Sequence, residues 1–388
     1  MRRPVFKLVW LALSLSTLKV SGQSLPQELT YQVDRNREVI ITKCSPSAEG
    51  EMVIPSVIEG RPVTSIGQLA FYKCESLTAI VIPDTLTTIE GDAFSGCASL
   101  TSINLPVNVS KIGGGAFRNC SNLISITIPD KCSSIYEYSF SGCTNLKSVK
   151  ISNNVTHIVM RAFEACRNLT SVNIPDSVIH IGIAAFSGCH SLSSISIPDS
   201  VTSIGDHAFS GCKLTSINIP DSVTNIGNGA FRGNRLRWVL LGKSVTSIGA
   251  DAFRSCRSLT SVTIPDSVSS IGADAFYGCD SLESIIVPET FYSQSWATLL
   301  GVYSLWPEGF YLPHDAPNPT ITTPAQVSLR MVPAITVTGE FGQSVIMEVA
   351  NTADGPWTEW RTIVIGEEGT TEVDLDEGAE KHFYRVRD

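Results

Sequence analysis

The chain repeats one formula every 22 or 23 residues, and this period constrains its fold more than any other feature. Leucine and phenylalanine recur in step, from Leu77 to Leu282 and from Phe71 to Phe276. The phenylalanine positions differ by 23 residues except for two steps of 22, into Phe231 and Phe253: 71, 94, 117, 140, 163, 186, 209, 231, 253 and 276. Such a period is the signature of a solenoid, in which each unit buries its apolar face against its neighbours.

One unit can be interpreted segment by segment. In LTSINIP, Ile217 and Ile219 alternate with polar residues, as in a half-buried strand. The proline that follows ends strand pairing, and Asp-Ser suits a turn. The next segment, VTSIG, predicts a second short extended edge, and x-x-A-F-x-x-C predicts a helical turn that buries Ala, Phe and Cys. We expect a parallel β-strand stack with short helical turns, in about ten coils.

These residues resemble the BspA-type leucine-rich repeat, whose formula is L-x-x-L-x-L-P-x-x-L-x-x-I-G-x-x-A-F-x-x-C. The resemblance covers about residues 54–288, and the segment 39–67 is similar to the first, capping coil of that family. It implies a leucine-rich-repeat solenoid. It also implies an exported or surface protein, because most members of this kind are exported or surface proteins and several act in adhesion.

The two ends of the chain differ from the repeats. Residues 1–23 combine two arginines with a short apolar run, which is typical of a secretory signal peptide; an N-terminal membrane anchor is the alternative. No later stretch is long and apolar enough to span a bilayer. We predict this order of domains: signal peptide 1–23, N-terminal capping coil 24–62, repeats 63–288, aromatic-rich cap 289–313, Pro-rich linker 314–326 and small β-sandwich 327–388.

The C-terminal segment has alternating apolar and polar runs separated by turn signals, which favours an all-β module. Its GQSVIMEV and FYRV stretches are similar to small β modules appended to exported bacterial proteins.

Composition and motifs exclude several function classes. A net charge of −9 and a pI near 5.2 argue against a nucleic-acid partner, which requires a basic surface. The chain has no G-x-S-x-G, H-E-x-x-H, P-loop or dinucleotide motif, so we expect neither an enzyme nor a cofactor. His207 and Asp206 are candidates for a catalytic set assembled from separate coils, but they occupy variable turn positions.

Nine of the eleven cysteines share one position of the repeat: 74, 97, 120, 143, 166, 189, 212, 256 and 279. Cys132 replaces the valine found at Val155 and Val178, so it also fills the core. Stacked coils bring neighbouring cysteines within bridging distance, but with parallel Cβ vectors that disfavour a disulfide. We expect buried thiols, and without C-x-x-C pairs we expect no zinc site.

Two columns of polar residues raise the question of a metal. Asp176, Asp199 and Asp221, with Asp130 and Asp266 in the same register, could hold Ca²⁺, but an aspartate that caps its own turn is the interpretation we favour. His157 and His180 share a register and should stack one coil apart. The residues flanking them in the column are serines, so a third ligand is missing and we expect no metal.

The strand face is mostly serine and threonine, with one column of serines, and two coils interrupt this hydroxyl-rich face. Lys147 and Lys150 lie in one of them. The other, FRGNRLRWVLLG, replaces the column cysteine with Asn234 and the Pro-Asp turn with Gly242-Lys243. Tryptophan and arginine are enriched at binding hot spots. Our candidate binding residues are Arg235, Arg237, Trp238, Leu240, Lys243, Lys147 and Lys150; the alternative is sequence drift in a degenerate repeat.

The main hypothesis is an exported, non-enzymatic recognition or adhesion protein, secreted or held at the cell surface as a monomer. It would bind an extracellular protein or polysaccharide through the strand face. The alternative is a structural spacer of the cell envelope or extracellular matrix. A more distant alternative is a hydrolase of extracellular polymers.

Overall fold

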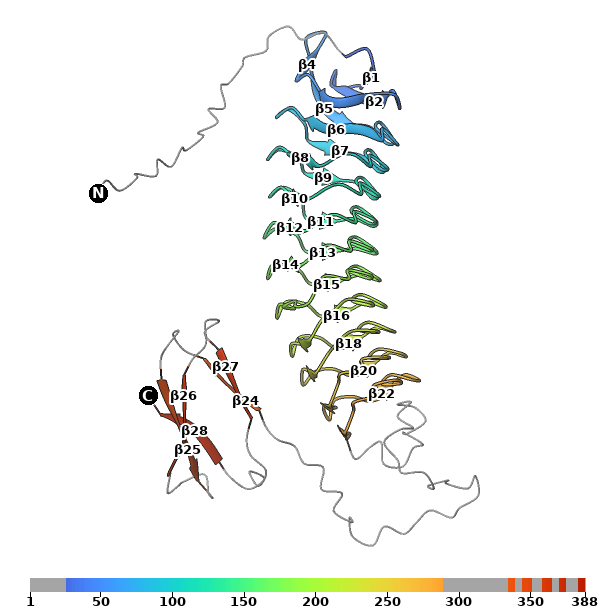
Figure 1. The fold of residues 1–388 in the computed structure, drawn as a ribbon. Helices are drawn as coiled ribbons and strands as arrows, with labels where there is room; N and C mark the ends of the chain where they lie inside the picture. The colour runs from blue at the N-terminus through green and yellow to red at the C-terminus, as the bar shows by residue number, and fades with distance from the viewer. Residues whose placement is uncertain are drawn as a thin grey trace, which may run out of the picture. The chain divides into compact units, whose positions relative to one another are not determined.

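The computed structural model describes residues 26–288 and five strands nearer the C-terminus. Residues 26–288 form a parallel β-solenoid of about eleven turns, as the repeat predicts (Figure 1). Most coils contribute one short strand to each of two columns, and residues 192–198, in the L-x-x-I-x-I segment of one coil, form no strand. The described part of the chain contains no helix with the length and apolar character that a bilayer span requires.

The strand face is the column built from the L-x-x-I-x-I segments. Its sheets have the orders β3-β6-β8, β10-β12-β14 and β17-β19-β21-β23. The bounds are β3 (Glu49–Val53), β6 (Ser76–Val81), β8 (Ser102–Ile103), β10 (Ser125–Thr127), β12 (Ser148–Lys150), β14 (Ser171–Val172), β17 (Ser216–Asn218), β19 (Trp238–Leu240), β21 (Ser261–Thr263) and β23 (Ser284–Ile286).

The second column contains the V-T-S-I-G segments, in the orders β1-β2-β5-β7-β9 and β11-β13-β15-β16-β18-β20-β22, with β4 paired to β5. Here β1 is antiparallel to β2, which is parallel to β5. The bounds are β1 (Leu29–Val33), β2 (Val39–Cys44), β4 (Val57–Ile58), β5 (Arg61–Ile66), β7 (Thr88–Ile89), β9 (Lys111–Ile112), β11 (Ser134–Ile135), β13 (His157–Ile158), β15 (His180–Ile181), β16 (Ser203–Ile204), β18 (Asn225–Ile226), β20 (Ser247–Ile248) and β22 (Ser270–Ile271).

The third side of each coil, which we call the turn edge, is the x-x-A-F-x-x-C segment. The helical turns expected there do not form; within residues 26–288 this segment is a run of tight turns. Asp92, Phe94 and Gly96 donate their N–H groups to carbonyls of the next coil at 2.7–2.9 Å. The alternate residues Ala93, Ser95 and Cys97 bond to carbonyls three positions earlier.

Left-handed backbone at two positions per coil produces this alternation. In the same coil Asp92 has φ 54° and Gly96 has φ 80°. A helix would direct its amides along its own axis to carbonyls within the coil, leaving none for the neighbouring coil. The run of turns therefore replaces the helix because it supplies hydrogen-bond partners both within the coil and to the neighbouring coil.

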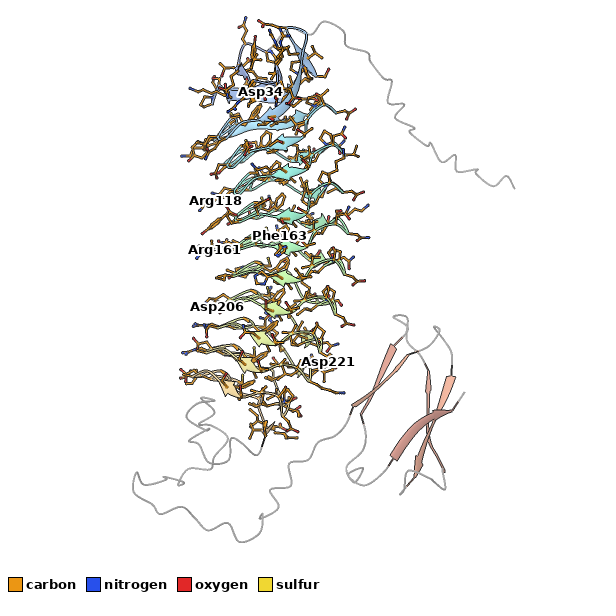
Figure 2. The ribbon with its side chains drawn as sticks, turned by 180° about the vertical axis from the view of Figure 1, so that it is seen from behind. Asp34, Arg118, Arg161, Phe163, Asp206 and Asp221 are labelled. Carbon is orange, nitrogen blue, oxygen red and sulfur yellow. The ribbon has the colours of Figure 1, made fainter. Side chains whose placement is uncertain are left out.

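A column of phenylalanines fills the centre of the solenoid. All ten are fully buried, and neighbouring rings stack with centroids 5.0–5.5 Å apart. Figure 2 shows Phe163 inside its coil, between the turn edge with Arg118 and Arg161 and the opposite edge with Asp221. Each ring contributes apolar area to two interfaces, so the column links the stability of successive coils.

The cysteine column lies beside the phenylalanines, and all eleven cysteines are buried and free in the structure. From Cys97 to Cys279, each column thiol donates to a phenylalanine carbonyl of the preceding coil at 3.1–3.3 Å. Cys132 lies outside this column and donates to the carbonyl of Val109 at 3.4 Å. The thiols therefore supply donors to buried carbonyls as well as apolar volume.

The C-terminal strands belong to a second compact unit that includes Ser304–Asp388. They form two antiparallel sheets, β24-β27 and β26-β25-β28, with the bounds β24 (Ala334–Thr338), β25 (Ser344–Ala350), β26 (Thr358–Val364), β27 (Thr370–Asp374) and β28 (Phe383–Arg387). That these sheets pack as a sandwich stays a prediction. The expected signal peptide (1–23), aromatic cap (289–313) and linker (314–326) lie outside the described residues.

We predict that Phe163→Ala lowers the free energy of unfolding by about 3–5 kcal/mol, because it opens a cavity between two ring stacks. Urea denaturation followed by far-UV circular dichroism measures the change. Lys150→Ala, on an exposed position of β12, is the control and should change stability by less than about 0.5 kcal/mol. A loss below about 1 kcal/mol for the phenylalanine variant would contradict a stability role for the column.

We also predict that alkaline pH destabilises the solenoid through its thiols. Burial raises the pKa of Cys132 from 9.0 to about 11 and that of Cys279 from 9.0 to about 12. The thiols of the unfolded chain lose their protons near pH 9.0. Between pH 9.0 and the raised pKa values, the folded state therefore binds more protons than the unfolded state. The free energy of unfolding therefore falls as the pH rises above 9.0, by about 3 kcal/mol for Cys132 alone.

Cys132→Val is the matched variant, because valine occupies the equivalent position in later coils and does not titrate. Urea midpoints measured from pH 8 to pH 11 should decline less steeply for this variant than for the wild type. Identical pH profiles would show that the Cys132 thiol does not contribute.

Candidate binding surface

The candidate residues on β19 alternate between solvent and core. Trp238 and Leu240 are 41% and 58% exposed, whereas Val239 between them is 8% exposed. Arg235 and Arg237 precede the strand and are also exposed. This coil therefore keeps the apolar interior of the repeat, and its unusual residues face outward.

Backbone pairing keeps β19 in register despite its unusual sequence. Ser216 pairs with Trp238, and Asn218 pairs with Leu240, in a parallel ladder. The N–H of Arg237 donates to the carbonyl of Thr215 at 2.7 Å, and the carbonyl of Leu240 accepts from Ile219 at 2.8 Å. The strand is thus as firmly positioned as its neighbours, so its side chains project from a rigid base.

Asn234 repairs a bond that the shortened repeat has lost. In a 23-residue coil the leucine N–H bonds to the cysteine carbonyl three residues earlier, as from Leu192 to Cys189 at 3.0 Å. Only one residue separates Cys212 from Leu214, so that bond cannot form. The Oδ1 atom of Asn234, in the next coil, accepts the Leu214 N–H at 3.0 Å instead.

The Asn234 amide nitrogen also takes over the role of the column thiol. It donates to the carbonyls of Phe209 and Phe231, both at 2.8 Å, and the residue is 3% exposed. A cysteine has a donor for one such carbonyl but is only a weak acceptor for an amide N–H. The replacement of cysteine by asparagine is therefore structural and does not belong to the binding surface.

Gly242 allows two turns to approach closely. A Cβ atom at this position would overlap the carbonyl of Pro220 and lie 2.6 Å from its carbonyl carbon, so neither proline nor alanine fits without a shift. The turn is still closed as in other coils, by the Val245 N–H and the Gly242 carbonyl at 3.2 Å. The close approach places the Lys243 N–H 2.7 Å from Oδ1 of Asp221.

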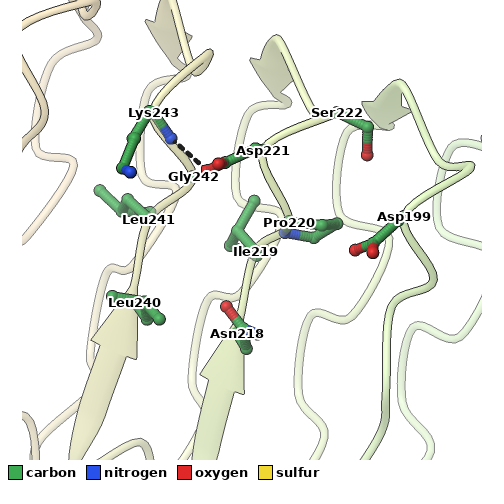
Figure 3. Close-up of a pocket in the computed structure, with 10 residues that line it drawn as sticks. All are labelled: Asp199, Asn218, Ile219, Pro220, Asp221, Ser222, Leu240, Leu241, Gly242 and Lys243. Atoms are coloured by element: carbon green, nitrogen blue, oxygen red, sulfur yellow. Dashed lines mark hydrogen bonds between the residues drawn. The ribbon is translucent and has the colours of Figure 1, made fainter.

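A cavity of about 550 Å³ lies beside this turn (Figure 3). It continues the exposed surface of β19, because Leu240 and Lys243 belong to both. Its other walls combine carboxylates, amide and hydroxyl groups with apolar atoms: Asp199, Asn218, Ile219, Pro220, Asp221, Ser222, Leu241 and Gly242. We call the exposed residues Arg235, Arg237, Trp238, Leu240 and Lys243, together with this cavity, the β19 surface.

The structure does not bring the two lysines of the candidate set to the β19 surface. Lys147 and Lys150 are exposed at β12, four coils from β19. At about 4.8 Å per coil the separation is about 19 Å, so these lysines form a different part of the strand face.

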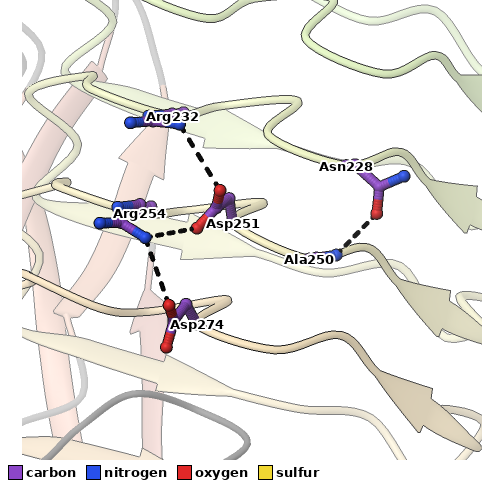
Figure 4. Close-up of polar contacts among 6 residues, drawn as sticks. All are labelled: Asn228, Arg232, Ala250, Asp251, Arg254 and Asp274. Carbon is purple, nitrogen blue, oxygen red and sulfur yellow. Dashed lines mark hydrogen bonds and ion pairs between the residues drawn. The ribbon is translucent and has the colours of Figure 1, made fainter.

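The other basic residues near this coil lie on the turn edge or directly after it. Arg232 pairs with Asp251 at 3.5 Å, and Arg254 pairs with Asp251 and Asp274 at 3.0 and 3.2 Å (Figure 4). Arg257 pairs with Asp280 at 3.5 Å. The basic residues near β19 therefore divide between the β19 surface and the region of the turn edge, where carboxylates compensate their charge.

Asp221, in the aspartate column, does not cap its own turn. Its Oδ1 atom accepts a hydrogen bond from the Lys243 N–H in the next coil. In these turns Ser177, Ser200, Ser222 and Ser267 donate to a valine carbonyl of the preceding coil, each at 2.6 Å. Within the described residues, no group of three or more His, Cys, Asp or Glu side chains could hold a metal ion. The interpretation of Asp221 as a local cap was wrong, since stacking supplies it with a donor from the neighbouring coil.

His157 and His180 pair across neighbouring coils as predicted, with ring centroids 6.4 Å apart. Their Nδ1 atoms bond to Thr156 and Ser203, both at 2.8 Å. Burial and, to a lesser extent, His157 lower the pKa of His180. The hydroxyl partners of both rings and the lowered pKa of His180 favour a structural contact.

His207 and Asp206 lie on the turn edge. Asp206 accepts hydrogen bonds from the backbone N–H and side-chain amide of Asn228, at 2.7 and 3.3 Å. Asn228 in turn accepts from the N–H of Ala250 at 2.8 Å. The Asp206 carboxylate is therefore the first acceptor in a series of hydrogen bonds that links successive coils along the turn edge, which is a structural role.

Sequence reasoning missed the cavity and the role of Asn234. In the sequence, the aspartates at 199 and 221 form a column but do not indicate a cavity. The cavity depends on how closely three successive turns approach one another. Asn234 had a detectable signal, since a buried polar residue coincides with the coils that lack one residue.

A comparison with family profiles agrees with the fold. A family profile described as the BspA type leucine rich repeat region matches residues 64–193 and 179–297, in six copies. Similar solved structures include a leucine rich cell surface protein from Faecalibacterium prausnitzii A2-165, with 28% identity, 72% of this chain and 98% of that chain covered, and a TM-score of 0.41. A leucine-rich repeat protein from Bacteroides ovatus ATCC 8483 has 26% identity, 69% and 89% coverage and a TM-score of 0.47. No curated protein matches the chain.

We predict that Asn234→Ala lowers the free energy of unfolding by about 2–4 kcal/mol, because it leaves the buried Leu214 N–H without its acceptor and removes the amide donor to two buried carbonyls. Asn234→Cys restores the residue typical of the column and a donor for Phe209, but not the acceptor for Leu214. It should therefore be intermediate in urea denaturation. A cysteine variant as stable as the wild type would contradict the compensating role.

Proposed function

Since the chain belongs to the BspA-type leucine-rich repeat family, we propose that it is a recognition protein that binds an extracellular protein through the β19 surface. The observation that carries this proposal is the exposure of Trp238, at 41%, in a column that is otherwise mostly serine, and of Leu240, at 58%, at a position that is polar in most other coils. Two apolar side chains exposed on the same face of one strand form a patch of the kind that marks interaction sites, whereas single exposed apolar residues are common.

The residue types favour a protein partner. Trp238 and Leu240 supply an apolar centre, and Arg235, Arg237 and Lys243 surround it with basic groups. This arrangement of an apolar or aromatic anchor and a charged rim is typical of protein interfaces, where tryptophan and arginine carry much of the binding energy. A polysaccharide would use the serine and asparagine positions of the face more than Leu240.

The cavity adds a site for one side chain of the partner. Asp199 and Asp221 provide carboxylates on one side, and Leu240 with Pro220 provides apolar contact. A lysine or arginine side chain of the partner matches this lining, because its stem packs on apolar atoms while its charge meets a carboxylate.

We further propose that the protein is exported, as its family resemblance and residues 1–23 indicate. Those residues combine a short basic start with an apolar run too short for a comfortable bilayer span. Binding without turnover is the expected activity. The motifs of the common hydrolases are absent from the sequence, and the candidate Asp206 is engaged by Asn228.

We predict that Trp238→Ala weakens binding to the partner by about 30-fold, the effect of losing a hot-spot side chain. The partner is first identified on an array of purified extracellular proteins and polysaccharides, and the dissociation constants are then measured by biolayer interferometry. Arg237→Ala should weaken binding less and chiefly slow association, with a strong dependence on salt.

Tyr72→Ala is the matched control, because Tyr72 is 43% exposed, close to the value for Trp238, but lies on the turn edge. It should bind as the wild type does. Equal binding by the Trp238 and Tyr72 variants would contradict the proposal that the β19 surface binds the partner. Exclusive binding to polysaccharides would overturn the choice of a protein partner, and absence of any ligand would favour the structural spacer.

A further inference from the structure

Cys44 and Cys74, which do not occupy equivalent positions of the repeat, lie close together in the first coil. Cys44 ends β2 and is not a member of the cysteine column, whereas Cys74 is the first member of that column. The N–H of Cys44 donates to the carbonyl of Ala70 at 2.5 Å. The end of β2 is therefore held against the turn that leads to Cys74.

The two sulfur atoms share one acceptor. The thiols of Cys44 and Cys74 each lie 3.6 Å from the carbonyl oxygen of Ser45, which brings the two sulfur atoms to the same acceptor. From Cys97 onward, each thiol of the column has a phenylalanine carbonyl of its own in the preceding coil. Because Cys44 comes from a different element, the parallel Cβ vectors that disfavour a bridge within the column do not apply to this pair.

The contact also differentiates the two thiols chemically. Interaction with the Cys44 side chain lowers the pKa of Cys74, and interaction with Cys74 together with burial raises the pKa of Cys44. The thiolate is the reactive form of cysteine. Cys74 is therefore the nucleophile of the pair, whereas burial raises the pKa of Cys97, the next thiol in the column.

We propose that Cys44 and Cys74 form an intramolecular disulfide on contact with a disulfide oxidant, fastening the N-terminal strand pair to the first repeat. The Cys74 thiolate attacks one sulfur of the oxidant and expels a thiolate, which gives a mixed disulfide. The Cys44 thiolate then attacks Sγ of Cys74 and expels the second thiolate. One oxidant disulfide is reduced to two thiols, which take up the two protons lost by the cysteines.

Such a bridge would act where a solenoid is weakest. A terminal unit has a repeat neighbour on one side only, so it opens more readily than interior coils and admits the oxidant. Both thiols are otherwise closed off, at 3% and 0% exposure for Cys44 and Cys74. A cross-link over this loop restricts the unfolded chain, and disulfides persist in the oxidising compartments to which we propose the protein is exported.

The test is thiol counting and peptide mapping of the full chain. Reduced protein is refolded with a mixture of oxidised and reduced glutathione, denatured in the presence of N-ethylmaleimide and analysed by intact mass. We expect nine of the eleven cysteines to be alkylated, and a proteolytic peptide pair joined through Cys44 and Cys74. Eleven alkylated cysteines, or a bridge between column neighbours such as Cys74 and Cys97, would overturn the proposal.

Two variants sharpen the result. In Cys44→Ser all ten remaining cysteines should be alkylated, whereas Cys132→Val, altered outside the pair, should keep the Cys44–Cys74 bridge. Oxidation should also raise the urea midpoint of the wild type and leave that of Cys44→Ser unchanged. A bridge that forms but leaves the wild-type midpoint unchanged would contradict the fastening role. Binding to the partner of the β19 surface does not enter these measurements, so the two proposals are tested separately.

Discussion

The hydrogen bond from one coil to the next is the constraint on which this structure depends. At the turn edge, alternate backbone N–H groups bond to the neighbouring coil, and at the two strand columns the parallel ladders do the same. Short strands of two or three residues would not be stable by themselves. Stacking satisfies their backbone groups while the phenylalanine column removes the apolar surface from water, so a coil is folded only as part of the array.

This constraint explains why the repeat tolerates a missing residue. The shorter coils retain the strand register, because the loss falls in the turn between the column cysteine and the leucine. The Leu214 N–H that loses its local acceptor finds one in Asn234 of the following coil. A buried amide in an otherwise apolar column is thus the consequence of a deletion one coil earlier, and the two changes stabilise the fold only together.

The sequence predicts the inward half of each coil well and the spaces between coils poorly. Periodicity identifies the solenoid, the buried Phe and Cys columns and the pairing of His157 with His180, because these depend on register alone. The prediction of a helical turn edge was wrong, since the A-F-x-x-C pattern also fits a helix. The positions with left-handed backbone are often occupied by residues other than glycine, such as Asp92 and Ala165, so the sequence does not mark them. The cavity beside Gly242 depends on the approach of neighbouring turns, which no single repeat encodes.

The direction in which an unusual residue points decides how it should be interpreted. Asn234 and Gly242 face inward or against a neighbouring turn, and each satisfies a packing or hydrogen-bonding need. Trp238 and Leu240 satisfy no such need, because Ser216 and Asn218 occupy the same positions of the preceding coil with identical pairing. A solenoid separates these cases clearly, since every position has equivalents in other coils. Deviations that the scaffold does not require are therefore the residues to which a binding function is best assigned.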